Sequence, residues 1–274
     1  MFYFTQSQDQ ATDRIRRGFP YFQIVLQPIV DLDSETVYGY EALCRGKQGE
    51  NYTALISDMA PCLIPAFDRL AMARALRLAA RFRLQAKGVK IAINLGPLMD
   101  TLGKDAACVM RLAKHYRLRA ASIMLELSED IRTNGDSYAQ IIGKHRAGGV
   151  VVAIDDFGAG YAGLNALATC APDVVKIDRK LIQGIEANDA KKTIVGALSK
   201  VCRKLGVMLI AEGVETNSEY EILRGFGIRF MQGFLFARPT ACEISRVWFP
   251  GKKTKHFPRI TRGDRVWLRN ALRQ

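Results

Sequence analysis

The chain has 274 residues, of which 49% are hydrophobic, and 40 lysines and arginines against 27 acids give it a net charge of +13. The chain has enough apolar side chains for a substantial core, which excludes global disorder. No run approaches the roughly 18 apolar residues of a membrane span. Because no apolar stretch of the secretory-signal type follows the N-terminus either, we predict a soluble, cytoplasmic protein.

Short β-rich runs alternate with helical patterns along most of the chain. Strands are predicted near residues 22–32, 36–45, 89–95, 121–128, 150–156, 173–178, 207–213 and 229–236. Helices are predicted at about 54–85, 104–117, 136–147, 161–169, 189–205, 216–226 and 241–249. Eight strands with intervening helices are typical of a (β/α)8 barrel. A doubly wound open sheet is the alternative, but no glycine-rich phosphate-binding turn follows the first strand.

The link between the first two strands is too short for a parallel connection. Only a few residues around Asp33-Ser34-Glu35 separate them, whereas a parallel crossover needs about a dozen or more. The two strands must therefore form an antiparallel hairpin, and a three-residue turn would pair Gln27 with Glu41. The predicted fold is α/β, a TIM-like (β/α)8 barrel with one antiparallel strand.

The barrel domain is expected to span residues 21–250, between an N-terminal extension (1–20) and a basic C-terminal extension (251–274). The C-terminal extension holds eight lysines and arginines against one acid. We expect a basic helix packed on the barrel through Val266, Trp267 and Leu272, with a partner or nucleic-acid contact as the alternative. No nucleic-acid motif is present, so nucleic-acid binding is not expected.

Polar residues recur at one position of the predicted strands. Alternate residues of a barrel strand face the interior and the surrounding helices. Seven strands present a small or apolar residue and, two positions later, a polar one: Gly39/Glu41, Ala92/Asn94, Met124/Glu126, Ala153/Asp155, Val174/Lys176, Ile210/Glu212 and Phe230/Gln232. Each of these residues could be an ordinary strand-end residue, but their common parity favours one site at the carboxyl ends of the strands, where barrel enzymes carry their chemistry.

Five of these polar side chains offer oxygen ligands: Glu41, Asn94, Glu126, Asp155 and Glu212. Converging carboxylates cannot all stay ionised unless a cation compensates them. Oxygen ligands indicate one or two Mg²⁺ or Mn²⁺ ions, and the scattered cysteines and histidines lack zinc-ligand spacing. Asp156 should point away from Asp155 while the strand lasts, and joins the site only if the strand ends there.

The ordered motifs resemble those of a known family. They are Gln27-Pro28-Ile29-Val30, Glu41-Ala42-Leu43-Cys44-Arg45, Ile93-Asn94-Leu95, Glu126-Leu127-Ser128-Glu129, Asp155-Asp156-Phe157-Gly158-Ala159-Gly160-Tyr161, Lys176-Ile177-Asp178, Ala211-Glu212-Gly213-Val214-Glu215 and Gln232-Gly233. Together, from about Phe22 to Pro239, they resemble EAL domains, bacterial phosphodiesterases of the second messenger cyclic di-GMP. The family fold is a TIM-like barrel with one antiparallel strand.

The resemblance implies roles for these residues. The metal ligands would be Glu41, Asn94, Glu126, Asp155, Asp156 and Glu212, with Asp155 bridging two ions. Lys176 would touch the attacking water or the phosphate, and Glu212 would lie where the family's proposed general base sits. The resemblance implies substrate contacts for Gln27 and Arg45, a supporting place beside the site for Gln232 and Glu215, and loop-anchoring roles for Glu129 and Asp178.

The implied activity is metal-dependent hydrolysis of cyclic di-GMP to linear pGpG. A catalytically silent receptor or protein-binding regulator is the alternative, although such relatives usually lose several metal ligands. We expect a homodimer. Because only some twenty residues precede the barrel, regulation is expected through a protein partner, dimerisation, transcription or a longer parent chain. Two departures from the family pattern, Ala159 and Gly46, affect the glycine-rich loop and the substrate contacts.

Overall fold

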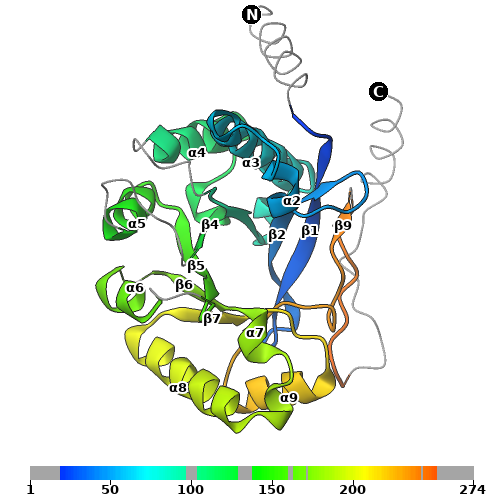
Figure 1. Cartoon of the computed structure of the whole chain (residues 1–274), viewed down its shortest axis with the longest axis vertical. Helices are drawn as coiled ribbons and strands as arrows, with labels where there is room; N and C mark the ends of the chain where they lie inside the picture. The colour runs from blue at the N-terminus through cyan, green and yellow to red at the C-terminus, as the bar shows by residue number, and fades with distance from the viewer. Residues whose placement is uncertain are drawn as a thin grey trace, which may run out of the picture.

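The computed structural model describes residues 19–96, 104–128, 138–159, 163–170, 172–241 and 243–251. Its strands are β1 (Phe22–Asp31), β2 (Thr36–Gly46), β3 (Lys90–Asn94), β4 (Ile123–Ser128), β5 (Val151–Phe157), β6 (Val174–Ile177), β7 (Met208–Ala211), β8 (Phe230–Met231) and β9 (Thr240–Ala241). Its helices are α2 (Tyr52–Ile56), α3 (Ile64–Arg81), α4 (Lys104–His115), α5 (Tyr138–Ala147), α6 (Gly163–Cys170), α7 (Arg179–Ile182), α8 (Asp189–Leu205) and α9 (Asn217–Gly225). Figure 1 shows the helices α3, α4, α5, α6, α8 and α9 in an arc outside the strands.

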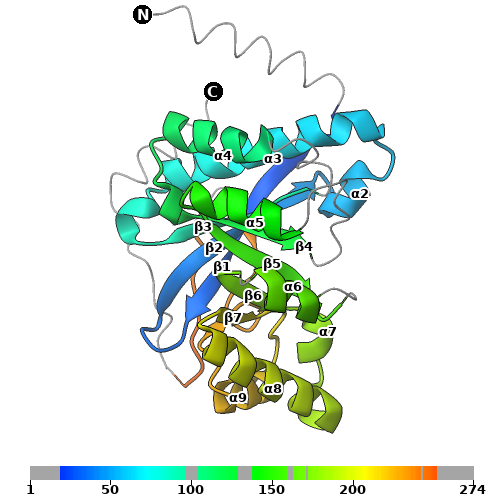
Figure 2. The same ribbon diagram turned by 90° about the vertical axis from the view of Figure 1, so that its left-hand side faces the viewer.

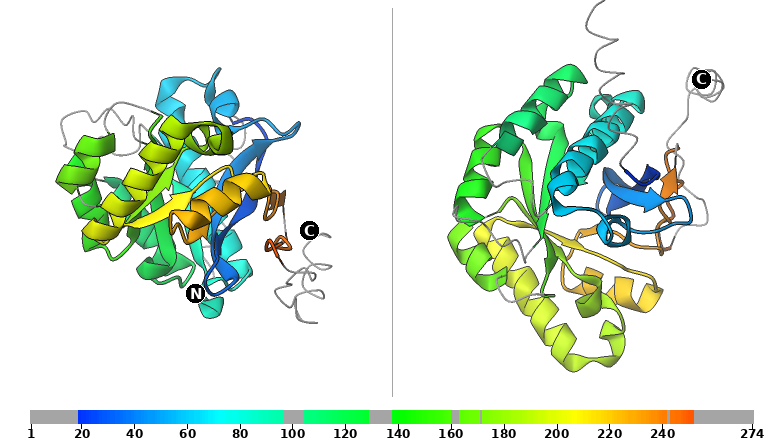
Figure 3. Two further views of the ribbon diagram at one scale, coloured as in Figure 1. Left: turned by 90° about the horizontal axis from the view of Figure 1, so that it is seen from below. Right: turned by 45° about the horizontal axis from the view of Figure 1, so that its top comes forward.

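The sheet closes into a barrel through its one reversed strand. Strands β2 to β8 run parallel in chain order, and β1 pairs antiparallel with both β2 and β8. The short strand β9 also pairs with β1, beyond its contact with β8. Figures 2 and 3 show the parallel strands at the centre, with α3 and α4 on one side and α8 and α9 on the other. The predicted barrel with one antiparallel strand is confirmed.

The hairpin register depends on a β-bulge. Gln27 pairs with Glu41, as predicted, but Asp31 pairs with Thr36, so the turn holds four residues instead of three. The register shifts by one between Ile29 and Val30 because β2 has an extra residue, Tyr38, at that point. A bulge inserts one residue into one strand of a pair. It compensates for the longer turn and returns Gln27 to the place beside Glu41.

The interior of the barrel is formed by the residues that the alternation pattern assigned to it. One buried cluster joins Ile29 of β1 to the small and apolar partners from the parallel strands: Ala92, Met124, Ala153, Val174 and Ile210. The opposite parity supplies two outer cores against the helices, with Ile91, Ile123 and Leu125 in one and Ile154, Val175 and Ile177 in the other. The inner layer closes the barrel beneath the polar strand ends.

Three predicted elements differ from the structure. The helix expected at 54–85 is divided because Pro61 and Pro65 can stand only in a first helical turn, so α2 ends and α3 begins anew. The strand expected at 229–236 stops at Met231. The helix expected at 241–249 is wrong: β9 pairs with β1, and the Trp248 N–H donates to the Phe236 carbonyl, which keeps the described part of this segment extended.

Two predictions concern segments that the structure does not describe. Residues 1–18 and 252–274, which include Val266, Trp267 and Leu272, lie outside the described residues.

Among the helices that are described, none is long and apolar enough to cross a membrane.

An ion pair stabilises the pairing of β1 with β8, where the barrel closes. Strands β1 and β8 share only two pairs, Val30 with Met231 and Asp31 with Phe230. The Arg229 guanidinium donates to both carboxylate oxygens of buried Asp31, at 2.6 and 2.5 Å. These hydrogen bonds hold the pKa of Asp31 well below its usual range. The folded barrel therefore favours the ionised carboxylate.

We expect Arg229→Gln to lower the urea midpoint of unfolding at pH 7, because it leaves the buried Asp31 carboxylate without its charged donor. A folded-state pKa below the unfolded value adds stability that is present above about pH 4 and is lost as the pH falls through the folded-state pKa. The difference between the two proteins should therefore shrink below pH 4. Urea unfolding at pH 7 and pH 3 measures it.

The matched control is Lys192→Gln. Lys192 pairs with the exposed Asp189 at 2.9 Å on α8, away from the β1–β8 pairing, and an exposed pair of this kind contributes little to stability. Equal losses of stability in the two variants would contradict the assignment of Arg229 to the stabilisation of the β1–β8 pairing.

Candidate active site

Seven polar side chains meet at the carboxyl ends of the parallel strands. Neighbouring strands are in register there: Glu41 pairs with Ala92, and Asn94 pairs with Glu126. Glu212 and Gln232 follow directly after the last residues of β7 and β8. The residues that the pattern singled out are therefore brought together: Glu41, Asn94, Glu126, Asp155, Lys176, Glu212 and Gln232.

Lys176 lies at the centre of this group and is fully buried. Its ammonium nitrogen Nζ lies 2.7 Å from Glu126, 2.9 Å from Asp155 and 2.5 Å from Glu212. A fourth carboxylate, Glu41, is 3.8 Å away. Four carboxylates thus share one lysine, so the cluster keeps an excess of acidic groups.

Two amide side chains donate to Glu41, and a third, that of Gln27, accepts from one of them. The Asn94 amide donates to Glu41 at 3.2 Å and to Glu126 at 3.3 Å. The Gln232 amide donates to Glu41 at 2.6 Å and to Gln27 at 3.2 Å. Gln27, the β1 residue placed here by the bulge, donates at 3.5 Å to the Ala237 carbonyl. These bonds fix the orientation of Glu41 from both sides.

Burial and mutual repulsion shift the titration of this cluster. Desolvation, assisted by the neighbouring carboxylates, raises the pKa of Glu126 and of Glu212 well above the usual value, although Lys176 acts in the opposite direction. Desolvation alone would lower the pKa of Lys176, but the four surrounding carboxylates raise it well above the usual value. Lys176 therefore stays charged. The acids around it still outnumber it, so the site favours the binding of a further cation.

Asp156 joins the site through a second bulge. In the β5–β6 ladder Ile154 pairs with Val175 and Phe157 with Ile177, so two residues of β5, Asp155 and Asp156, oppose one residue of β6. Asp156 has a φ of 54°, in the left-handed region that non-glycine residues seldom occupy. The sequence pattern required the strand to end at Asp156 if this residue was to join the site. Instead, β5 continues to Phe157, and the bulge removes Asp156 from the alternation of side chains along the strand.

Asp156 is more exposed than its neighbour but still lies among acids. Desolvation, followed by the charges of Asp155 and Asp178, raises its pKa to about 6. Asp178 is buried, caps the N-terminus of α7 by accepting from the Lys180 N–H, and hydrogen-bonds Asp156. The contact partner of Asp178 is thus Asp156, the residue that leaves the strand pattern.

The remaining predicted residues lie farther out. Glu215 is exposed, and its backbone N–H donates to Glu219 at 2.8 Å. Arg45 is half-buried and donates to the Cys44 carbonyl at 2.7 Å. Glu129 lies outside the described residues. Their assigned roles stay predictions.

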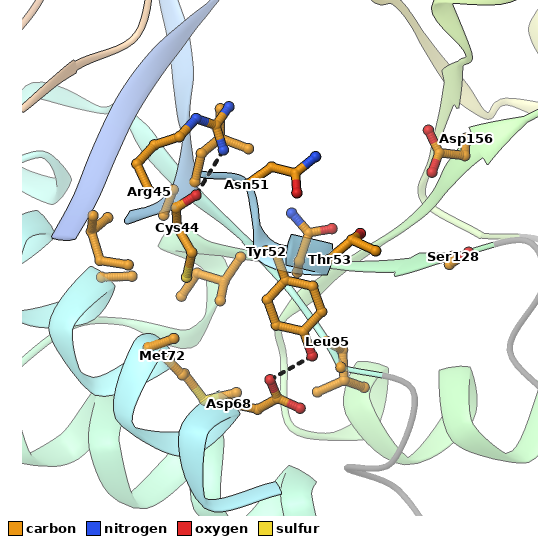
Figure 4. Close-up of a pocket in the computed structure, with 18 residues that line it drawn as sticks. Cys44, Arg45, Asn51, Tyr52, Thr53, Asp68, Met72, Leu95, Ser128 and Asp156 are labelled. Carbon is orange, nitrogen blue, oxygen red and sulfur yellow. Dashed lines mark hydrogen bonds between the residues drawn. The ribbon is translucent and has the colours of Figure 1, made fainter. Parts of the chain in front are cut away.

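A cavity of about 480 Å³ adjoins the cluster on the side of β2, β3 and α2. Figure 4 shows Arg45 and Tyr52 on one side of it and Asp156 on the other. Tyr52 donates to the buried Asp68 carboxylate at 2.8 Å. Sequence reasoning missed both residues. The available signal was Asp68 itself, an acid on the apolar face of α3 between Ile64, Phe67 and Met72.

The donor set fits hard divalent cations. Carboxylate oxygens of Glu41, Glu126 and Asp155 lie within 4.8 Å of one another, and so do those of Asp155, Asp156 and Glu212. Asp155 belongs to both groups. The oxygens of Glu126, Asp155 and Glu212 that face Lys176 have no other hydrogen-bond donor among the described residues. All-oxygen groups of this kind suit Mg²⁺ or Mn²⁺.

Known proteins share this chain's sequence pattern. The family model described as EAL domain matches residues 9–239. The antirepressor BluF of Escherichia coli K12 is 31% identical over 82% of this chain and 56% of its own length. The probable cyclic di-GMP phosphodiesterase PdeA of the same organism is 28% identical over 76% of this chain and 31% of its own length. The chain thus spans only about a third to a half of these relatives.

Solved structures agree with the sequence comparison. A standalone EAL protein from Vibrio cholerae O395 in its c-di-GMP-bound form has a TM-score of 0.74 at 33% identity, covering 81% of this chain and 92% of that one. BlrP1 of Klebsiella pneumoniae, in a manganese and cy-diGMP complex, has a TM-score of 0.73 at 34% identity, covering 80% of this chain and 56% of that one. The chain therefore belongs to the EAL domain family.

Proposed function

We propose that the chain is a metal-dependent phosphodiesterase that hydrolyses cyclic di-GMP to linear pGpG. The observation that carries the proposal is a group of five carboxylates, four of them around Lys176, which forms two sets of ligand atoms sharing Asp155. Relatives named as cyclic di-GMP phosphodiesterases support the choice of substrate.

Two ions, Mg²⁺ or Mn²⁺, are proposed for the cluster. Glu41, Asn94, Glu126 and Asp155 would hold the first, and Asp155, Asp156 and Glu212 would hold the second. Such ions lower the pKa of a bound water and neutralise the phosphate of a diester. A calcium and a manganese complex of the relative BlrP1 with cy-diGMP are compatible with divalent ions at this kind of site.

The chain's own side chains would carry the rest of the chemistry. Lys176 supplies a fixed positive charge where negative charge accumulates during attack on the phosphate. Glu212, whose pKa is raised by desolvation, would take the proton of the attacking water, since a raised pKa brings a carboxylate closer to the operating pH. Gln27, Arg45, Gln232 and Glu215 are proposed to contact or support the substrate, and Glu129 and Asp178 to anchor the adjoining loops.

The direct test is to incubate the purified chain with cyclic di-GMP and Mg²⁺ or Mn²⁺ and to identify the product by chromatography. We expect conversion to pGpG that stops on addition of EDTA. Nucleotide that remains intact with each of several divalent ions would overturn the proposal.

A silent receptor or protein-binding regulator is the second candidate, and one observation favours it. The relative BluF is named an antirepressor, and its match covers 82% of this chain. Binding of cyclic di-GMP in calorimetry without any pGpG would support the receptor. The retained carboxylates favour the enzyme, because a receptor has no need for such a repulsive cluster.

Metal affinity should fall as the pH drops through about 6, because the pKa of Asp156 is raised to about 6 in the metal-free protein and only the ionised carboxylate binds a cation. We expect Mn²⁺ titrations from pH 5 to 8 to show this step. Asp156→Asn should weaken binding and remove the part of the pH dependence that centres near 6. The matched control is Glu221→Gln, which removes an exposed acid from α9. A step that persists in Asp156→Asn would contradict the assignment.

The proposal also covers partners and location. The proposed substrate is a second messenger made inside bacterial cells, so the proposed location is the cytoplasm. The net charge of +13 would steer an anionic dinucleotide toward the chain. A homodimer and a regulatory protein partner are also proposed. Light scattering on the purified chain would test for the dimer.

A further inference from the structure

The loop that follows β8 carries an exposed aromatic side chain two residues after Gln232, which belongs to the polar site. The loop begins at Gln232, which donates to Glu41, and passes Ala237, whose carbonyl accepts from Gln27. Between them stands Phe234, which is 45% exposed, whereas Phe236 two residues later is 2% exposed in the outer core. Packing thus accounts for one phenylalanine of this loop and leaves the other in solvent.

We propose that Phe234 is a stacking platform for one guanine base of the cyclic dinucleotide, with Arg238 holding the ring from its other face. This proposal rests on the proposed function, because it concerns the same substrate. The Arg238 guanidinium lies 4.4 Å from the centroid of the Phe234 ring. One ring face therefore has a cation over it, and the exposure of Phe234 leaves area for a second planar group.

The platform stands on a rigid backbone. The Val214 N–H donates to the Gln232 carbonyl at 3.1 Å, and the Leu235 N–H donates to the Val214 carbonyl at 3.0 Å. A side chain at Gly233 would meet the Val214 carbonyl oxygen at 2.0 Å, so only glycine allows this close approach. The loop is thereby clamped to the segment that carries Glu212, and Phe234 keeps a fixed place relative to the catalytic cluster.

The other end of the platform is fixed as well. The buried Ser245 hydroxyl donates to the Arg238 carbonyl at 3.3 Å and shares a 2.8 Å hydrogen bond with Thr240. Thr240 pairs in turn with Leu26 of β1. The backbone at Arg238 is thus held against the barrel wall, so its exposed side chain begins at a fixed position close to the Phe234 ring.

The chemistry of the substrate matches this arrangement. Cyclic di-GMP has two purine bases, and base-to-aromatic stacking is favourable for every base because each has a π-face. A guanidinium near the ring adds attraction for an anionic ligand and for electron-rich rings. The 480 Å³ cavity adjoins Glu41 through Asn94, whereas the platform adjoins Glu41 through Gln232. Two bases on one phosphate ring could therefore be received on two sides of Glu41.

The test compares Phe234→Ala with Phe234→Tyr. We expect the alanine variant to raise the KM for cyclic di-GMP about tenfold, as the loss of one stacked base would, with kcat within about twofold because the ring touches no reacting atom. Tyrosine should keep the wild-type KM. Leu205→Ala, at an exposed residue ending α8, is the control and should change neither constant.

A spectroscopic measurement separates stacking from turnover. A cyclic dinucleotide in which 2-aminopurine replaces one guanine loses fluorescence when that base stacks. Mixed with the protein and Ca²⁺, it should be quenched by the wild type and by Phe234→Tyr, and remain bright with Phe234→Ala.

The outcomes distinguish the two proposals. Unchanged KM and unchanged quenching in Phe234→Ala, in a chain that hydrolyses cyclic di-GMP, overturn the platform and leave the function standing. A wild-type chain that neither binds nor hydrolyses cyclic di-GMP overturns both.

Discussion

Lys176→Met is expected to lower the free energy of unfolding of the metal-free protein by about 3–5 kcal/mol, because removing one partner of a buried ion pair leaves the other charges uncompensated. Lys176 is fully buried and contacts Glu126, Asp155 and Glu212 within 3 Å. Methionine has a similar length and no charge, so packing changes little. Urea unfolding in EDTA at pH 8 measures the loss.

The pH dependence of this loss has a defined sign. Without the lysine, the already raised pKa values of Glu126 and Glu212 should rise further. A carboxyl with a raised pKa in the folded state binds its proton more tightly there than in the unfolded chain, so stability falls as the pH rises from the unfolded value toward the folded one. The deficit of Lys176→Met should therefore be larger at pH 8 than at pH 5.

Divalent ions should recover part of the lost stability, because they supply the missing positive charge to the same carboxylates. Adding Mn²⁺ is expected to raise the unfolding midpoint of Lys176→Met more than that of the wild type. Lys180→Met, which removes an exposed lysine from α7, is the control and should change stability by less than about 0.5 kcal/mol. A Lys176→Met protein as stable as this control would contradict a central role of the lysine charge.

The alternation of strand side chains predicted most of the site because it depends only on local geometry. Residues two apart face the same side of a strand, so Ala92 and Asn94, or Met124 and Glu126, had to share the barrel interior once the strands were recognised. The inner apolar cluster has this composition. The closeness of Lys176 to Glu126 followed from the same rule, since their strands end at one rim.

The bulges could not be predicted, because they break this rule. Tyr38 is one residue too many in β2, and Asp156 is one too many in β5. The sequence permitted Asp156 to enter the site only at the end of its strand; a left-handed residue within the strand achieves the same result. A bulge depends on the fit of the neighbouring strand, which a linear pattern does not contain.

Tertiary contacts decided the remaining differences. The segment after Pro239 has a helical pattern, but pairing with β1 and burial of Val247 and Phe249 hold its described part extended. Asp68 and Tyr52 come from different helices, and their hydrogen bond at the cavity wall depends on how α2 folds back toward α3. Such approaches result from packing between elements and therefore lie beyond sequence periodicity.

Glu126→Gln is expected to raise the stability of the metal-free protein and to abolish turnover. Glu126 is 0% exposed, and desolvation together with Glu41, Asp155 and Glu212 outweighs Lys176 and raises its pKa. The ionised form is therefore less favourable in the folded chain than in water, and a neutral amide of the same shape removes that cost. The unfolding midpoint in EDTA at pH 8 should rise above that of the wild type.

The same substitution removes a carboxylate that the proposed mechanism requires, so hydrolysis of cyclic di-GMP should fall by about a thousandfold or more. Mn²⁺ should then stabilise Glu126→Gln less than it stabilises the wild type, because one ligand charge is missing. Glu126→Ala separates charge from packing, since it also removes the charge but leaves a cavity and should be less stable than the glutamine variant. A glutamine variant that is less stable than the wild type in EDTA, or that retains a tenth of its activity, would show that the buried acid serves the fold. A gain in stability joined to a loss of activity is the result expected of a buried acid whose ionised form is needed to bind a cation.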